Sequence, residues 1–108
     1  LDSAGYADFL QAACDTIMAR GKAKPGDKTM IDALHPAAAT AATVRTLSLP
    51  EAAEAVAIAG ETGRDDSSAL IATLGRAKTL GEASIGFPDA GACSVAIILR
   101  TISDFINQ

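Results

Sequence analysis

Aromatic residues, histidine and cysteine are scarce in this chain: its 108 residues include no tryptophan, one tyrosine, three phenylalanines, one histidine and two cysteines. A core with so few rings must be filled by small side chains, and 49% of the residues are apolar, with alanine the commonest type. Because alanine has the highest helix propensity, this composition favours an all-helical fold. A chain of this length can bury one modest core, so we expect a single domain or part of one.

The sequence also lacks the features of several functional classes. No run of Lys or Arg is present and the net charge is -4, which argues against a nucleic-acid partner. The only histidine, His35, has no second histidine or cysteine at metal-ligand spacing, so no metal site is predicted. The Gly-x-Ser-x-Gly turn of many hydrolases and the glycine-rich loops of the common nucleotide-binding folds are both absent. Zinc enzymes, serine hydrolases and the common nucleotide folds are therefore poorly supported.

Three further absences bear on location. Cys14 and Cys93 belong to no Cys-x-x-Cys pair, a pattern typical of reduced thiols in a cytoplasmic protein. No apolar stretch approaches the roughly 20 residues that a membrane-spanning helix needs, so no membrane is expected. The chain starts at Leu1 without an initiator Met or a basic leader, and we expect it to be a trimmed or partial polypeptide.

Apolar residues recur at spacings of three and four along most of the chain, which is the period of one helix face. Four helices are expected: from Ser3 to Gly21, from about Thr29 to Thr46, from Ser48 to about Leu74, and from Asp89 to the end. Ser3 and Asp89 are the expected N-caps of the first and last helix. Ser48 and Glu51 form a capping box at the start of the third. Gly60 and Gly63 predict a kink or break within it.

Two glycine-punctuated segments, residues 20–28 and 75–91, stand out between these helices. Each leads into a helix N-terminus, where free backbone N–H groups and the helix dipole favour a bound anion. The alternative is that both are solvated connections. Asp27 and Lys28 could be read as a catalytic pair, because phosphoryl transfer needs positioning and charge neutralisation. A structural role is expected instead, with Asp27 capping the helix that starts near Thr29.

Both segments resemble signatures of one family. Residues 21–30, Gly-Lys-Ala-Lys-Pro-Gly-Asp-Lys-Thr-Met, are similar to the Gly-x-x-x-Pro-Gly-Asp-Lys-Thr-Met segment of the L-subunit family of dihydroxyacetone kinases. Residues 75–92 resemble the family's second signature, in the expected order. The resemblance implies an all-α fold in which antiparallel helices form the later half of an eight-helix barrel. Residues 1–108 would then be the C-terminal half of a nucleotide-binding domain.

The resemblance also implies a site, carried over position by position. The residues expected at the nucleotide are Gly21, Thr29 and Met30 beside the adenine and ribose, Arg76 close by, and Asp89, Ala90 and Gly91 closing over the base or ribose. The ligand would be ATP or ADP with magnesium. No catalytic residue and no metal ligand is expected in this chain, because the family holds its magnesium ions with aspartates of the earlier half.

The implied function is that of a kinase part. The completed domain would transfer a phosphoryl group from a magnesium nucleotide, either ATP or ADP recharged by a phosphotransferase-system protein, to dihydroxyacetone or a related short ketose. Its partners would be the missing N-terminal half and a substrate-binding domain or subunit, and the chain alone would be inactive. The alternative is a non-catalytic helical module that binds an anion or self-associates through an exposed apolar face.

Overall fold

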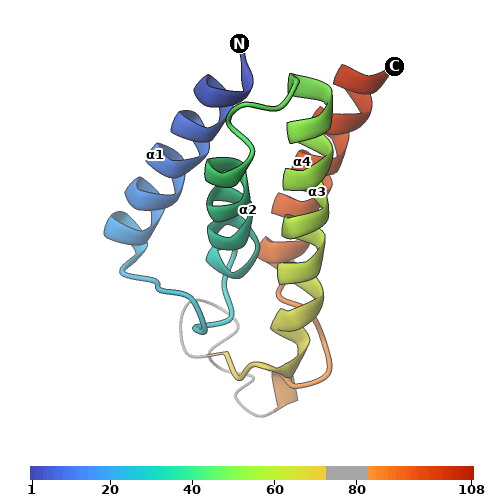
Figure 1. The fold of residues 1–108 in the computed structure, drawn as a ribbon. Coiled ribbons are helices and arrows are strands. Elements are labelled where there is room, and N and C mark those ends of the chain that lie inside the picture. The colour runs from blue at the N-terminus through green and yellow to red at the C-terminus, as the bar shows by residue number, and fades with distance from the viewer. Residues whose placement is uncertain (73–82) are drawn as a thin grey trace.

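The computed structural model describes residues 1–72 and 83–108, and this part of the chain contains helices and no strand. The helices are α1 (Ser3–Gly21), α2 (Ile31–Thr43), α3 (Leu49–Asp66) and α4 (Ala90–Asn107), with a short 3-10 turn, η1 (Ser67–Ala69). Successive helices run in opposite directions. Helix α2 lies between α1 and α3, and α4 lies behind α3 (Figure 1). The predicted all-helical fold of four helices is confirmed.

Local capping explains where two of the helices begin. The Ser48 hydroxyl accepts a hydrogen bond from the Glu51 backbone N–H at 3.3 Å and donates to the Glu51 carboxylate at 2.8 Å, which confirms the predicted capping box. Asp89 caps α4 by accepting from the Ala92 N–H at 2.9 Å, also as predicted. These signals lie within four residues and can be recognised without knowledge of the fold.

The predicted cap of α1 is wrong by one residue. Asp2 is the N-cap, and its carboxylate accepts a hydrogen bond from the Gly5 N–H at 2.7 Å. Ser3 instead points inward and donates to the Leu47 carbonyl at 2.6 Å, so its hydroxyl joins α1 to the connection between α2 and α3. A carboxylate at the N-cap also suits the positive end of the helix dipole.

Helix α3 runs unbroken through Gly60 and Gly63, contrary to the predicted kink, and it ends at Asp66 rather than near Leu74. Both glycines are buried at helix contacts. A Cβ atom on Gly60 would lie 2.8 Å from a Leu99 side-chain carbon, and one on Gly63 would collide with the backbone of α2. Close packing of α2 and α4 against α3 offsets the low helix propensity of glycine.

The core consists mainly of small side chains, as the composition predicts. Alanines from all four helices are buried, and the larger buried side chains include Tyr6, Leu10, Ile31, Val56 and Leu99. Tight approach of small residues lets three helices cover α2 despite the short chain. This core fixes the N-terminus of α4 relative to the N-terminus of α2, because Ile31 and Ala92 both belong to it.

A charged cluster joins α3 to α4 on the outer surface. The Arg100 guanidinium binds both carboxylate oxygens of Glu61, at 2.7 and 3.1 Å, and one oxygen of Glu54 at 2.7 Å. These bonds lower the pKa of Glu61 and of Glu54 below their usual value. Bidentate geometry fixes the register of the two helices.

One helix in the described part of the chain, α4, is long and apolar enough to span a membrane by length and composition, with a mean hydropathy of 1.2 over 18 residues. The sequence prediction of no such stretch is therefore too strict. The criterion is weak evidence for a membrane, because the core helix of a soluble protein also meets it. Within this window 28% is buried, including Val95 and Leu99. Helix α4 packs on α3, and Arg100 forms the ion pairs described above.

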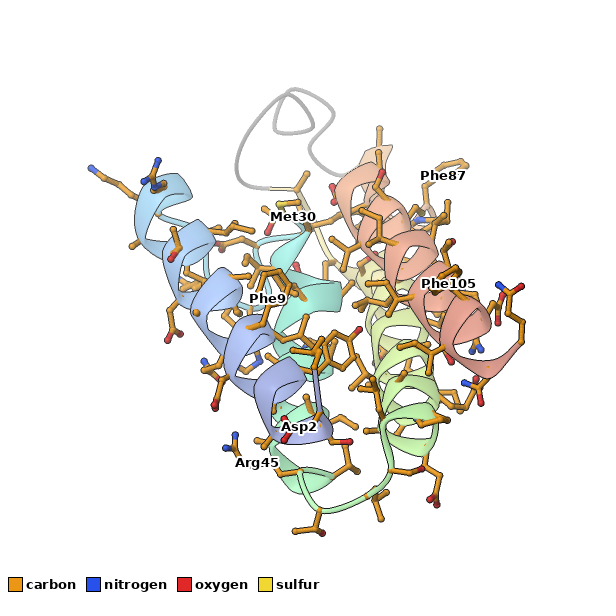
Figure 2. The ribbon with its side chains drawn as sticks, turned by 90° about the horizontal axis from the view of Figure 1, so that it is seen from above. Asp2, Phe9, Met30, Arg45, Phe87 and Phe105 are labelled. Carbon is orange, nitrogen blue, oxygen red and sulfur yellow. The ribbon has the colours of Figure 1, made fainter. Side chains whose placement is uncertain are left out.

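An apolar groove of about 200 Å³ lies between α1 and α4. Leu34 and Met30 line it together with side chains of the two flanking helices, which are Phe9, Leu10, Ala13, Ile17, Val95, Ile98, Leu99 and Ile102. Figure 2 shows Phe9 and Met30 in the space between α1 and α4. Phe9 is 62% exposed and Ile98 is 57% exposed, so much of the surface of these two side chains faces solvent.

Candidate functional site

The segment between α1 and α2 is organised by Asp32. One carboxylate oxygen accepts from the Gly26 N–H at 2.7 Å, and the other accepts from the Thr29 N–H at 2.9 Å. Asp32 lies in the first turn of α2, where a negative charge is favourable. The carboxylate therefore fixes the backbone that leads into Met30.

The predicted capping role of Asp27 is wrong. Helix α2 begins at Ile31, and its N-cap is Met30, which makes no side-chain capping bond. Asp27 accepts a hydrogen bond from the Lys24 N–H at 3.0 Å and so stabilises the turn before the helix. Capping of this end falls instead to Thr29, whose hydroxyl accepts from the Ile31 N–H at 3.2 Å.

Three residues of this segment have a left-handed backbone: Lys22, Gly26 and Lys28, with φ of 53°, 98° and 61°. Glycine adopts this conformation freely, whereas for a lysine it costs about 1 kcal/mol. Gly21 precedes them as the last residue of α1, and a Cβ added to it would meet no atom within 4 Å. Gly21 therefore borders open space.

The N-terminus of α4 lies against the start of α2. A Cβ atom on Gly91 would stand 3.2 Å from the Met30 Cβ and 3.3 Å from the Met30 backbone nitrogen. Only a residue without a side chain fits there without displacing Met30. Met30, at the end of the first family signature, therefore meets Gly91 of the second, 61 positions later in the sequence.

Asp89 fixes the direction in which the chain enters α4. Its backbone N–H donates to the Ser67 hydroxyl at 2.9 Å, and its Oδ2 accepts from the Ala92 N–H. The remaining oxygen, Oδ1, has no hydrogen-bond partner among residues 1–72 and 83–108. Ala90 follows as the exposed first residue of α4.

A hollow of about 410 Å³ opens beside this helix end. It is mostly apolar, and of the described residues only Lys28 and Asp89 bring a charged group to it. The described lining residues are Lys28, Ala83, Ser84, Phe87, Pro88, Asp89 and Ala90. Phe87 stands at the surface of this region and is 69% exposed (Figure 2). An apolar hollow with a few polar groups at one side suits a flat, partly polar small molecule.

The structure thus brings together Met30, Asp89, Ala90 and Gly91, four of the seven residues predicted at the nucleotide. Thr29 is adjacent to Met30, and its side chain is committed to the start of α2. No contact joins Gly21 to this group among the interactions described, and Arg76 lies outside the described residues. Sequence reasoning missed Asp32. It considered Lys28 only as one half of a catalytic pair with Asp27, and the Asp-Lys-Thr-Met run was the signal that drew attention to it.

Magnesium does not fit the described part of the chain. No group of three or more Asp, Glu, His or Cys side chains is placed to hold a metal within residues 1–72 and 83–108. Both oxygens of Asp32 accept backbone N–H groups, and one oxygen of Asp89 caps α4.

The known proteins to which this chain is similar include erythrulose kinases and ADP-binding subunits of dihydroxyacetone kinases. The family model described as the DAK2 domain matches residues 1–104. The L-erythrulose kinase of Pectobacterium atrosepticum is 44% identical over 109 residues, which cover 99% of this chain and 18% of that kinase. The ADP-binding subunit DhaL of the PEP-dependent dihydroxyacetone kinase of Escherichia coli is 38% identical over 100 residues, which cover 91% of this chain and 47% of the subunit. The matched region thus spans less than half of either relative.

Proposed function

The chain belongs to the DAK2 domain family, and from this we propose that it forms one side of the nucleotide site in a cytoplasmic ketose kinase. The observation that carries the proposal is the contact of Gly91 with Met30 beside the hollow lined by Asp89 and Ala90. Two segments that resemble the nucleotide-binding signatures of a kinase family meet there.

At the end of the bundle where Gly91 meets Met30, each residue has a role that its chemistry supports. The flexible, polarizable Met30 side chain packs against the flat face of an adenine ring. The Oδ1 oxygen of Asp89 accepts a hydrogen bond from a ribose hydroxyl. Gly91 keeps the helix end close enough to Met30 for both to reach one ligand. For Arg76, the resemblance alone supports a role as a hydrogen-bond donor to the nucleotide.

The reaction we propose is transfer of a phosphoryl group to a short ketose. Magnesium would neutralise charge on the transferring group, with ligands supplied from elsewhere in the kinase. The E. coli relative is named an ADP-binding subunit of a PEP-dependent enzyme, and the P. atrosepticum relative is named an L-erythrulose kinase. Both ATP and recharged ADP therefore stay open as donors, and dihydroxyacetone and erythrulose as acceptors.

The apolar groove between α1 and α4 supports a further part of the proposal. We propose that another segment of the kinase covers this groove and completes an eight-helix barrel, because a relative such as the E. coli subunit extends well beyond the matched region. A continuous patch of exposed apolar side chains, such as the one that lines this groove, commonly marks an interface. A substrate-binding domain or subunit would then deliver the ketose to the completed site.

A chimaera tests the proposed function. This chain replaces the matched region of the P. atrosepticum L-erythrulose kinase, and phosphorylation of L-erythrulose and dihydroxyacetone is measured with magnesium and ATP. We expect activity within about tenfold of that kinase, a loss of about 1.4 kcal/mol in transition-state stabilisation. The chain alone, as the control, is expected to give no turnover. A folded chimaera that phosphorylates neither ketose contradicts the proposal.

A further inference from the structure

Lys28 is a buried lysine that the proposed function does not yet use. The residue is 3% exposed, although lysine is almost never fully buried without a partner. The ammonium donates hydrogen bonds to two backbone carbonyls, that of Leu70 at 3.1 Å and that of Ser84 at 2.5 Å. It forms no ion pair with a carboxylate in the described part of the chain.

This arrangement is costly in two ways. The left-handed backbone of Lys28 is unfavourable for a residue with a side chain, and burial of an ammonium without an anion is unfavourable in any conformation. Strained residues of this kind persist where the surrounding structure determines them, and they cluster at functional sites. The Lys28 side chain extends inward from this left-handed backbone and makes its two hydrogen bonds there.

The two bonds connect parts of the chain that are far apart in sequence. Leu70 is 42 residues from Lys28, and Ser84 is 56 residues from it. A hydrogen bond from the Ala72 N–H to the Ser84 hydroxyl at 3.0 Å holds the segment around Leu70 and the segment around Ser84 together. Lys28 thus lies at the point where Leu70, which precedes the second signature, and Ser84, which belongs to it, come side by side.

The path from Ser84 leads directly to the helix end of the proposed site. The Gly86 N–H donates to the Ser68 carbonyl at 2.7 Å, and the Asp89 N–H donates to the Ser67 hydroxyl at 2.9 Å. On its other side, Lys28 immediately precedes Thr29 and Met30. One ammonium therefore connects both sides of the proposed nucleotide site.

We propose that Lys28 is a positioning residue: by joining Leu70 and Ser84 it holds the start of α4 against Met30, so that both can contact one nucleotide. The inference rests on the proposed nucleotide site and adds to it a residue that acts through others. Met30 and the residues Asp89 to Gly91 make the contacts, and Lys28 sets the distance between them.

The test is an NMR titration of the chain with ADP, in which the Met30 methyl signal gives the affinity. For Lys28→Met we expect ADP affinity to fall by roughly tenfold, a coupling typical of linked sites. The backbone amide signals of Gly86, Asp89 and Gly91 are expected to shift without ligand. Lys28→Arg is expected to regain part of the affinity, because a guanidinium can also donate to two carbonyls.

Two further variants make the outcome decisive. Lys22→Met is the matched control, since Lys22 is an exposed lysine with the same left-handed backbone, and it is expected to bind ADP as the unmodified chain does. Lys28→Gly removes the ammonium while relieving the backbone strain, so it serves if Lys28→Met fails to fold. Unchanged ADP affinity and unchanged amide signals in a folded Lys28 variant overturn the proposal. If the unmodified chain does not respond to ADP, the proposed nucleotide site itself is wrong and the role of Lys28 falls with it.

Discussion

Replacement of Gly63 by alanine is expected to destabilise the chain by about 3 kcal/mol, at the upper end of the usual cost of overpacking. A Cβ atom at this position would collide with the Asp32 carbonyl oxygen, and it would lie 2.8 Å from the Pro36 ring and 3.0 Å from the Ala33 Cα. Two of these three neighbours are backbone atoms of a buried helix, which cannot rotate away. The free energy of unfolding, measured in urea, checks the prediction.

Gly60→Ala is the matched control for this substitution. Gly60 lies on the same helix and is also buried, and both changes gain about 1 kcal/mol of helix propensity. The near neighbour of an added Cβ at Gly60 is the end of the Leu99 side chain, which can turn aside. Gly60→Ala should therefore cost clearly less. Equal stability of the two variants would show that α2 and α3 are not as close as described.

Replacement of Ile98 by glutamate is expected to abolish the activity of the chimaera while the chain alone still folds. Ile98 is 57% exposed in the chain and lines the groove between α1 and α4. If another kinase segment covers the groove, the carboxylate is buried without a partner, at a cost of several kcal/mol. Ketose phosphorylation by the chimaera and circular dichroism of the chain measure the two effects.

Ile97→Glu is the control for that experiment. Ile97 is the preceding residue on α4, is 63% exposed, and does not line the groove. The chimaera with Ile97→Glu should keep its activity. Equal activity of the two chimaeras would contradict the covered groove. If instead the chain alone forms dimers that Ile98→Glu dissolves, the alternative of a self-associating module gains support.

Features set by neighbouring residues could be predicted from the sequence. The starts of α3 and α4 depend on hydrogen bonds within three residues, from Ser48 and Asp89, and both predictions are confirmed. The predicted cap at Ser3 is wrong because its hydroxyl binds the Leu47 carbonyl, a partner 44 residues away. The break expected in α3 is wrong for the same reason, since the partners of Gly63 lie on another helix.

In the candidate site, too, features that depend on distant partners could not be predicted from the residues alone. Resemblance to a family proposed Met30 and Gly91, and the fold brings them into contact. The buried Lys28 side chain combines a left-handed backbone with hydrogen bonds to carbonyls 42 and 56 residues away. No local sequence pattern encodes these distant partners. The roles of Gly21 and Arg76 stay predictions.

The central claim is that the end of the bundle where Met30 meets Gly91 binds a nucleotide. The most direct measurement is an NMR titration of the chain with ADP that follows the backbone amides of Asp89, Ala90 and Gly91 and the Met30 methyl group. The account predicts saturable shifts of these signals with one common affinity. It predicts no shift in the first turn of α3, because the N-terminus of α3 lies at the opposite end of the bundle from the start of α4 (Figure 1). Absence of any response at millimolar ADP, or shifts confined to other residues, would contradict it.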